Sequence, residues 1–293
     1  MKKNIAIVCG GDSSEAEVSL KSGKNLKTMM NNDKYNTFIV FMKGKHWVVQ
    51  IEGKEDIVID KSDFSFSIDG KKTTIDCAYI TIHGTPGENG ILQSYFELVG
   101  IPYTSCGVFA SATTFNKFAC KAFLKEYGIQ SAKAILVRKG DSIDAKNIID
   151  TLGSPCFVKP NNAGSSFGVS KVKTAADIQP ALDKAFAEDS EVIIEVFLSG
   201  TEITNGIYST KGQTTVLPIT EIVTENEFFD YEAKYTGKSS EITPARLTPG
   251  VEKEVKALTE KIYKALGCNG IARVDYIVSK DKISMLEVNT TPG

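Results

Sequence analysis

The chain has 293 residues, of which 42% are hydrophobic and 24% are charged, and its formal net charge is −2. This length allows about two domains, or three small ones, and the composition is that of a globular protein rather than a disordered, collagen-like or coiled-coil chain. A nucleic-acid-binding protein would usually be basic, and no apolar stretch is long enough to span a membrane, so we expect neither partner. The 6 cysteines form no C-x-x-C pair, which favours reduced thiols in a cytosolic protein.

The N-terminal part alternates strands with helices. A buried strand at Ile5–Val8 is followed by Gly10-Gly11 and a helix to about Met30, in which Ser14 and Glu17 have capping-box spacing. The next expected elements are strands at 37–41 and 75–82, a glycine-rich turn at 83–90, a helix at 91–99 and a short strand at 102–104. This alternation predicts a parallel α/β sheet.

The rest of the chain also mixes helices and strands. Expected helices cover 115–128, 143–152, 173–186 and 251–266, and Pro180 should kink or interrupt the third. Expected strands cover 134–137, 155–160, 169–172, 192–198, 202–208, 215–223, 271–278 and 283–289, and a polar loop with several aromatic residues covers 224–243. The sequence shows no internal repeat, and the predicted fold class is α/β.

The last two predicted strands bring acidic side chains together. Alternate side chains share a face of a strand, so Arg273 lies with Asp275 and Glu287 lies with Asn289. A three-residue connection at 280–282 would set Asp275 opposite Glu287. Facing carboxylates repel unless a cation lies between them, and such oxygen ligands suit Mg²⁺. A solvated, charged sheet face is the alternative.

Lys159 is a second candidate, because it lies near the end of a predicted strand before the glycine- and serine-rich loop 161–168. Backbone N–H groups of such a loop can bind phosphate oxygens, and a lysine on the strand can meet the same charge. An ordinary flexible hairpin is the alternative. No G-x-x-x-x-G-K-[ST] loop is present, and Gly10-Gly11 gives no G-x-G-x-x-G pattern.

The stretch Gly164–Gly168 matches the G-x-S-x-G pattern of serine hydrolases. In that fold a histidine follows the serine along the chain, whereas both histidines here, His46 and His83, precede it. The pattern also lies between two strands rather than at a strand-to-helix turn. Chain order therefore argues against a hydrolase.

Three polar residues of the N-terminal part have both a structural and a functional explanation. Glu15 suits the N-terminus of the first helix electrostatically. Glu88 could be a simple loop residue, and a histidine such as His83 is more often a hydrogen-bonded structural group than a ligand. The residues alone leave these alternatives open.

Taken in chain order, several separated motifs resemble D-alanine–D-alanine ligases of the ATP-grasp superfamily. They are GGDSSEAEVSL at 10–20, HG at 83–84 with GENG at 87–90, PYT at 102–104, Lys117, VKP at 158–160 with GSSFGVSK at 164–171, DYEAKY at 230–235, RVD at 273–275 and LEVNTTPG at 286–293. Each motif alone is weak, but the ordered set covers nearly the whole chain and is highly specific.

The resemblance implies three α/β domains: an N-terminal domain at 1–108 on the side of the first D-alanine, a central ATP-grasp subdomain at 109–196 and a C-terminal subdomain at 197–293. ATP would lie between the last two. The implied ATP-binding residues are Lys117, Lys159, Ser166, Glu195, Val196, Leu198, Glu202 and Lys234. Among them the lysines contact phosphates, Lys234 on a lid loop reaching the γ-phosphate. Glu195 and the backbone at Val196 and Leu198 hold adenine, and Glu202 binds the ribose.

The resemblance also implies the remaining site residues. Asp275, Glu287 and Asn289 would bind two Mg²⁺ or Mn²⁺ ions. Catalytic roles fall on Glu15, Ser165, Tyr235, Arg273 and Gly293, with Glu15 holding the ammonium of the first D-alanine and Arg273 forming an oxyanion pair with the Gly293 amide. His83 would lie near the carboxylate of that alanine. The family often has lysine or arginine at Val196 and aspartate at Asn89, so Asn89 stays unassigned.

The implied reaction is ATP-dependent ligation of two D-alanine molecules through an acyl phosphate, for peptidoglycan synthesis, by a cytoplasmic homodimer that acts on small molecules. A D-alanine–D-lactate or D-alanine–D-serine ligase is the alternative, although Tyr235 disfavours the lactate type. The family also continues beyond Thr-Pro-Gly, with residues that help to hold the second alanine. A chain that truly ended at Gly293 should bind ATP yet form little dipeptide.

Overall fold

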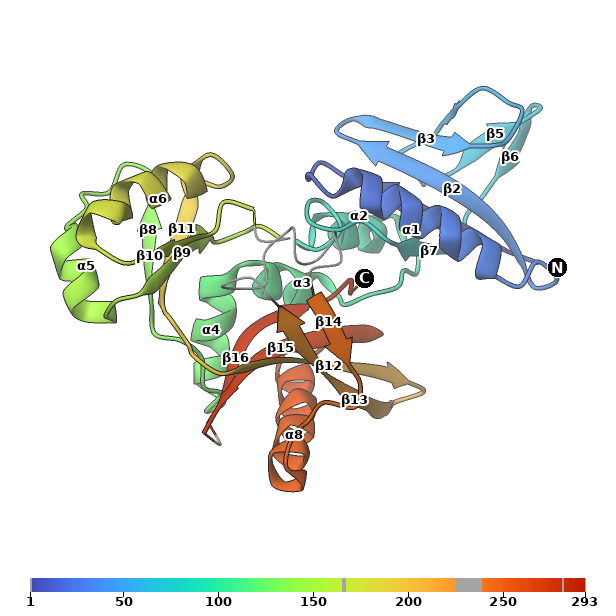
Figure 1. The fold of residues 1–293 in the computed structure, drawn as a ribbon. Coiled ribbons are helices and arrows are strands. Elements are labelled where there is room, and N and C mark those ends of the chain that lie inside the picture. The colour runs from blue at the N-terminus through green and yellow to red at the C-terminus, as the bar shows by residue number, and fades with distance from the viewer. Residues whose placement is uncertain (1, 165–166, 225–238, 281, 293) are drawn as a thin grey trace. The chain divides into compact units, whose positions relative to one another are not determined.

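The computed structural model describes residues 2–164, 167–224, 239–280 and 282–292. The chain forms two compact units, which are described separately below (Figure 1). Unit 1 consists of Met1–Ala112, Cys268–Ile271 and Thr290–Gly293, and unit 2 of Thr113–Gly267 and Ala272–Asn289. No helix in the described part of the chain has the length and apolar character needed to cross a bilayer.

Unit 1 is built on a five-stranded sheet of order β4-β3-β2-β1-β7. Its strands are β1 (Lys3–Gly10), β2 (Tyr35–Lys43), β3 (His46–Gln50), β4 (Ile57–Val58) and β7 (Cys77–Ile80). As the sequence predicts, β1 pairs in parallel with β2 on one side and with β7 on the other. The antiparallel additions β3 and β4 and the small hairpin of β5 (Phe66–Ile68) and β6 (Lys71–Thr73) were not predicted.

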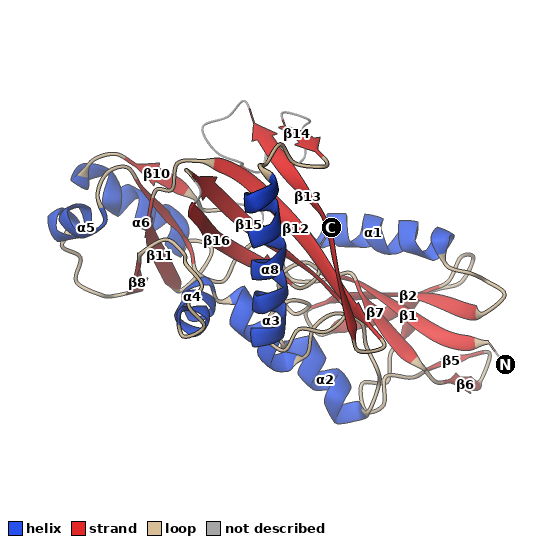
Figure 2. Ribbon diagram, turned by 90° about the horizontal axis from the view of Figure 1, so that it is seen from below, coloured by secondary structure: helices blue, strands red, loops and turns tan. Residues whose placement is uncertain are grey.

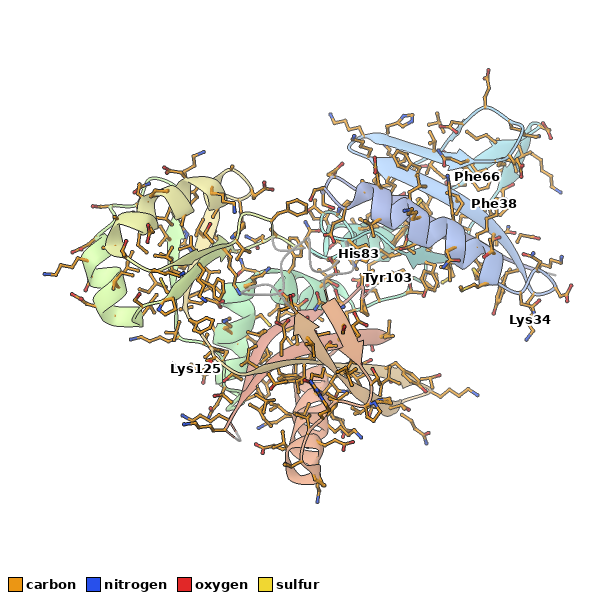
Figure 3. All side chains as sticks on the ribbon, in the orientation of Figure 1. Lys34, Phe38, Phe66, His83, Tyr103 and Lys125 are labelled. Atoms are coloured by element: carbon orange, nitrogen blue, oxygen red, sulfur yellow. The ribbon has the colours of Figure 1, made fainter. Side chains whose placement is uncertain are left out.

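Helices cover both faces of this sheet. Because side chains alternate along β1, Ile7 packs toward α1 (Ala16–Met29), while Val8 packs in a cluster with Phe96 of α2 (Ile91–Val99). The β5–β6 hairpin joins the same core through an edge-to-face contact of Phe38 with Phe66, whose ring centroids are 5.0 Å apart (Figure 3). Unit 1 is therefore a layered α/β structure.

The predicted capping box of the first helix is wrong. The helix starts at Ala16, so Glu15 occupies the N-cap position, and no side chain caps it. Instead, the Ser13 hydroxyl accepts the backbone N–H of Glu15 at 3.2 Å and donates to the His83 carbonyl at 2.8 Å. A tertiary contact to the 83–90 loop thus replaces the local cap.

Unit 2 contains two sheets, of which the first has the order β10-β9-β11-β8 and is antiparallel. Its strands are β8 (Ala134–Arg138), β9 (Cys156–Pro160), β10 (Ser170–Val172) and β11 (Glu191–Val196). The helices α5 (Ala145–Leu152) and α6 (Ile178–Phe186) pack against one face through an apolar cluster that includes Val158, Ile194 and Leu182. The opposite face carries Lys159 and Glu195 together with the buried Ile193.

Two helix boundaries differ from the prediction. Pro180 does not interrupt its helix, because α6 starts at Ile178 and Pro180 therefore lies in the first turn. Backbone N–H groups of a first turn have no intrahelical acceptor, so the N–H that proline lacks costs the helix no hydrogen bond. The helix expected at 115–128 is observed as the shorter α4 (Lys117–Lys125), and a division separates it from α3 (Val108–Phe115), which was not predicted. The division falls at Asn116, whose side-chain oxygen caps α4 by accepting the Ala119 N–H at 2.8 Å.

The second sheet of unit 2 has the order β14-β13-β12-β15-β16. Its strands are β12 (Thr201–Thr210), β13 (Gln213–Thr224), β14 (Ser239–Ile242), β15 (Ile271–Ser279) and β16 (Lys282–Asn289). Helix α8 (Pro249–Ala265) crosses one face of this sheet and contacts β12 and β13 (Figure 2). The order sets β12 beside β15, which brings Thr204 next to Asp275 as described below.

Candidate active site

The predicted residues of unit 1 gather at the carboxyl end of β1, which lies between β2 and β7. The chain leaves β1 toward β2 on one side and later enters β7 on the other, so the loops that follow β1 and β7 diverge at this point. Ligands of open α/β sheets bind in the crevice made at such a switch point. Glu15 follows β1 and His83 (labelled in Figure 3) follows β7, so the topology brings both predicted residues to this crevice.

Hydrogen bonds tie these two loops together. Besides the Ser13 contacts, the Asp12 N–H donates to the Thr85 carbonyl at 2.9 Å, and the Glu88 carboxylate accepts the Gly84 N–H at 2.7 Å. Glu15 is only 8% exposed, and His83 is half-buried. Glu88 therefore has a structural role in shaping the loop that carries His83.

The glycine pair after β1 is required by backbone geometry and space. Gly10 and Gly11 both have left-handed φ angles, +97° and +99°. A Cβ on Gly10 would lie 2.4 Å from the Met42 carbonyl oxygen, and one on Gly11 would lie 2.6 Å from Cγ2 of Ile82. Glycine thus lets the chain turn closely over the sheet before it delivers Glu15.

In unit 2, Lys159 and Glu195 lie on the face of the first sheet that is turned away from the cluster of α5 and α6. Glu195 of β11 is paired with Phe157 of β9, and Lys159 lies two residues further along β9, on the same face. The two side chains are therefore diagonal neighbours across the strands, and the Lys159 ammonium forms an ion pair with one carboxylate oxygen of Glu195. A second lysine, Lys121 of α4, pairs with the other oxygen.

The charges of this cluster shift one another's pKa values. Burial raises the pKa of Glu195, but the positive charges of Lys159 and Lys121 outweigh it and lower the pKa to about 2. Burial lowers the pKa of Lys159, but the charge of Glu195 outweighs it and the net shift is upward. Both groups therefore stay ionised near neutral pH.

The C-terminal end of β11 also presents backbone groups. The Val196 N–H donates to the Lys133 carbonyl at 3.0 Å, so the contact with a nucleotide that we expect at this residue would have to use its carbonyl. Leu198 and Glu202 follow within a few residues, and both are half-buried. The charge of Glu202 contributes to raising the pKa of Lys159, which indicates that the two side chains are near each other.

Lys117, the first residue of α4, is held by Asn161, which the sequence analysis did not single out. The Asn161 carbonyl accepts the Lys117 N–H at 3.1 Å, and its side-chain oxygen accepts the Phe118 N–H at 2.9 Å. Asn161 is fully buried and donates in turn to Glu191 at 2.9 Å. The Lys117 ammonium donates to the Ala163 carbonyl and lies 3.9 Å from Glu287.

The C-terminal hairpin has the predicted residue pairs, but its turn and register differ from the prediction. Arg273 faces Asn289 and Asp275 faces Glu287, as predicted. However, Ser279 pairs with Lys282, so two residues rather than the expected three connect the strands. A β-bulge between Asp275 and Tyr276 restores the register by leaving one extra residue, Leu286, on β16.

The bulge also decides which residues of β16 face the core. Ile283 and Met285 are buried, and a regular strand would turn Glu287 to the same side. After the extra residue the pattern reverses, so that Val288 is buried while Glu287 and Asn289 are half-buried. The bulge therefore removes Glu287 from the core face.

Asp275 is the centre of a hydrogen-bond network. Arg273 donates to both of its carboxylate oxygens at 3.0 Å, Asn289 donates to Oδ2 at 2.9 Å, and Thr204 donates to Oδ1 at 2.6 Å. Thr204 comes from β12, and only the strand order reveals it as a partner. Asp275 is 8% exposed, and its orientation is fixed.

The donor set fits a hard cation that retains other ligands. Within the described residues, no three His, Cys, Asp or Glu side chains gather as a complete metal cage. Two carboxylates and the amide oxygen of Asn289, whose nitrogen already faces Asp275, make a partial oxygen shell. Mg²⁺ is bound in this way, with water and phosphate oxygens completing its coordination.

Five predicted site residues lie outside the described part of the chain, so the structure does not test them. They are Ser165, Ser166, Lys234, Tyr235 and Gly293. The other predicted residues fall into one group in unit 1 (Glu15 and His83) and one in unit 2 (Lys117, Lys159, Glu195, Val196, Leu198, Glu202, Arg273, Asp275, Glu287 and Asn289).

Comparison with known proteins assigns the chain to a family. Residues 4–106 match the family described as D-ala D-ala ligase N-terminus, and residues 123–293 match D-ala D-ala ligase C-terminus. The chain belongs to the D-alanine–D-alanine ligase family. It is thus an ATP-dependent ligase of the ATP-grasp fold, as the sequence predicts, and this family implies ATP and a divalent metal ion.

Individual ligases match along the whole chain. The D-alanine–D-alanine ligase of Phocaeicola vulgatus is 55% identical over 100% of this chain and 91% of its own length. That of Bacteroides fragilis is 52% identical with the same coverage.

Solved structures of ligases agree. D-alanyl-alanine synthetase A of Vibrio cholerae has a TM-score of 0.88 and 29% identity, and it covers 100% of this chain and 90% of its own. VanG D-Ala:D-Ser ligase of Enterococcus faecalis has a TM-score of 0.87 and 31% identity, covering 100% and 91%. A Bacillus anthracis D-alanine–D-alanine ligase complexed with ATP has a TM-score of 0.78 and 29% identity, covering 99% and 87%.

We predict that Asp275→Asn lowers ATP-dependent ligase turnover by on the order of a hundredfold or more, because it removes a carboxylate from the proposed metal donor set. The side chain keeps its size but loses acceptor capacity toward Arg273, Asn289 and Thr204, so the melting temperature should fall while the protein still folds. Turnover is measured as phosphate release at saturating Mg²⁺, and near-normal turnover would contradict the assignment.

Thr204→Val is the matched control, because it removes only the hydroxyl that orients Asp275 and leaves the charges of Asp275 and Arg273 in place. Loss of one such hydrogen bond should reduce turnover by roughly tenfold at most.

Proposed function

We propose that this ligase joins two D-alanine molecules to D-alanyl-D-alanine at the expense of ATP, as a step of peptidoglycan synthesis. The observation that supports this most is the juxtaposition in unit 2 of Lys117 with Glu287, one of the facing carboxylates, 3.9 Å apart. A phosphate-binding cation thus lies beside the proposed metal ligands, as phosphoryl transfer requires.

The proposed reaction has two steps. A carboxylate oxygen of the first D-alanine bonds to the γ-phosphorus of ATP while the bond to ADP breaks, which gives an acyl phosphate. The amine of the second D-alanine, after losing a proton, then bonds to that carbonyl carbon, and phosphate leaves. Such chemistry depends on positioning and charge neutralisation more than on a protein nucleophile.

The ATP site in this proposal uses the residues of the first sheet of unit 2 and of α4. Lys117 and Lys159 neutralise phosphate charge. Glu195 and the backbone at Val196 and Leu198 bind adenine, and Glu202 binds the ribose hydroxyls. We also include Ser166 and Lys234, as phosphate contacts.

Asp275, Glu287 and Asn289 would hold two Mg²⁺ or Mn²⁺ ions. When bound there, the ions supply positive charge to the phosphate oxygens. Arg273 and Thr204 keep Asp275 in a fixed orientation from two sides. Oriented ligands of this kind are a general requirement of metal sites.

We propose that the alanine substrates bind near the carboxyl end of β1. Glu15 holds the ammonium group of the first D-alanine together with Ser165 and Tyr235, and His83 lies near its carboxylate. Arg273 and the Gly293 amide stabilise the oxyanion. Two of the guanidinium N–H donors of Arg273 bond to Asp275, and a guanidinium has five, so it can serve both partners.

Phosphate release and product analysis with defined amino acids test the function. We expect the purified enzyme, with the residues by which the family continues beyond Thr-Pro-Gly, to form D-alanyl-D-alanine and phosphate from ATP and D-alanine, and not from L-alanine. Adding D-serine or D-lactate with D-alanine tests the alternative acceptors, of which D-serine is favoured by the similarity to VanG D-Ala:D-Ser ligase. A mixed product in preference to D-alanyl-D-alanine would contradict our substrate assignment.

We predict that Lys234→Ala lowers the rate of phosphoryl transfer at least tenfold while ADP affinity changes little, because ADP lacks the γ-phosphate that Lys234 would contact. Single-turnover phosphate release gives the rate, and calorimetric titration with ADP is the control. Equal losses in rate and in ADP affinity would show that Lys234 acts elsewhere.

We propose three domains, 1–108, 109–196 and 197–293. In support, each range contains one complete main sheet: β1 to β7, β8 to β11, and β12 to β16. We also propose a cytoplasmic location, where ATP is available and the free cysteines would remain reduced.

We further propose a homodimer. Two large apolar side chains of α2, Ile91 and Leu98, are 59% and 87% exposed and lie seven residues apart, on one side of the helix. We expect sedimentation of the wild type as a dimer and of Leu98→Asp as a monomer, because a charge cannot be buried in that contact without a partner. An unchanged dimer would exclude this face as the interface.

A further inference from the structure

We propose that Lys121 is a positioning residue of the ATP site, which holds the Glu195 carboxylate so that Lys159 can exchange Glu195 for an ATP phosphate. This inference rests on the proposed function, in which Lys159 neutralises a phosphate. Nothing in the sequence pattern distinguishes Lys121 from the other lysines of its helix.

The contacts around Glu195 motivate this role. Lys121 pairs with Oε1 of Glu195, and Lys159 pairs with Oε2, so two ammonium groups share one carboxylate. The Lys121 and Glu195 side chains are only 7% and 5% exposed, and that of Lys159 is 15% exposed. The three charges are thus a compact, buried cluster with one positive charge in excess.

A single lysine could not serve both partners. If Lys159 were the only cation beside Glu195, its movement to a phosphate would leave a buried carboxylate without a counter-charge, which is strongly unfavourable. With Lys121 in place, the exchange leaves a neutral Lys121–Glu195 pair and a new Lys159–phosphate pair. Lys121 therefore makes the excess positive charge available to ATP.

The position of Lys121 on α4 suits a fixed partner. It lies one helical turn after Lys117, so one helix supplies a lysine for the phosphate and a lysine for the carboxylate. The start of the helix is held by the Asn116 cap and by Asn161. Burial and the neighbouring charge of Lys159 lower the pKa of Lys121, and the Glu195 carboxylate opposes this shift without reversing it.

The test compares Lys121→Met with Lys125→Met. Lys125 lies one turn further along α4 and is exposed (labelled in Figure 3), so it controls for removing a lysine from this helix. Affinity is measured with a fluorescent, non-hydrolysable ATP analogue in the absence of D-alanine. We expect Lys121→Met to weaken binding about tenfold or more, since it leaves Lys159 as the only counter-charge of Glu195. Lys125→Met should bind as the wild type does.

A double-mutant cycle shows whether Lys121 acts through Glu195. In the Glu195→Gln background no carboxylate needs a counter-charge, so adding Lys121→Met should cause no further loss of affinity. In steady-state assays, Lys121→Met should raise the KM for ATP with little change in kcat, because Lys121 does not touch the reacting atoms. Undiminished affinity, or an equal loss in both backgrounds, would overturn the proposal.

Two further outcomes are informative. If Lys121→Met does not fold but the double variant with Glu195→Gln does, the coupling through Glu195 is supported. If neither folds, Lys121 is a packing residue and the proposal is wrong. A wild-type chain that binds the analogue but forms no dipeptide would refute the proposed function alone, because the binding cycle does not require D-alanine.

Discussion

Acidic groups that leave water in unit 2 are compensated by positive charge or by directed hydrogen bonds, and this constraint organises the proposed site. Glu195 has two lysines, Asp275 has Arg273, and Glu287 lies near Lys117. Each of these carboxylates thus already has a positively charged neighbour in the ligand-free protein. Nucleotide and metal would bind by exchanging partners within these pairs rather than by introducing charge into an apolar interior.

The need for compensating charge is met by residues of a sheet and of a helix together. Strand alternation sets Lys159 and Glu195 on one face of a sheet whose other face is an apolar core. The helix α4 then adds charge from outside the sheet, and Asn161 fixes its first turn. Strand geometry therefore sets Lys159 and Glu195 on one face, and side chains of α4 complete the charged cluster.

Much of the architecture could be predicted from local pattern, and the misses have identifiable causes. The parallel strands of unit 1 and the helix at 91–99 follow from periodicity and glycine turns. The capping box of Ser14 and Glu17 failed because the helix starts two residues after Ser14, and Pro180 was tolerated because it lies in a first turn. Thr204, Asn161 and Lys121 escaped prediction because strand order and helix docking, which no local pattern encodes, bring them to the site.

The facing pair Asp275 and Glu287 was predicted with a three-residue turn, whereas the protein uses a two-residue turn and a bulge. Both arrangements set Asp275 opposite Glu287, because the residue that the turn loses becomes the extra residue of the bulge. The hairpin can thus change its length only in coupled steps. A single insertion or deletion between Lys282 and Glu287 that neither the turn nor the bulge absorbs would exchange the core and site faces of β16, while a compensating pair would preserve them. Evolution of this segment is therefore restricted by the number of its residues as well as by their chemistry.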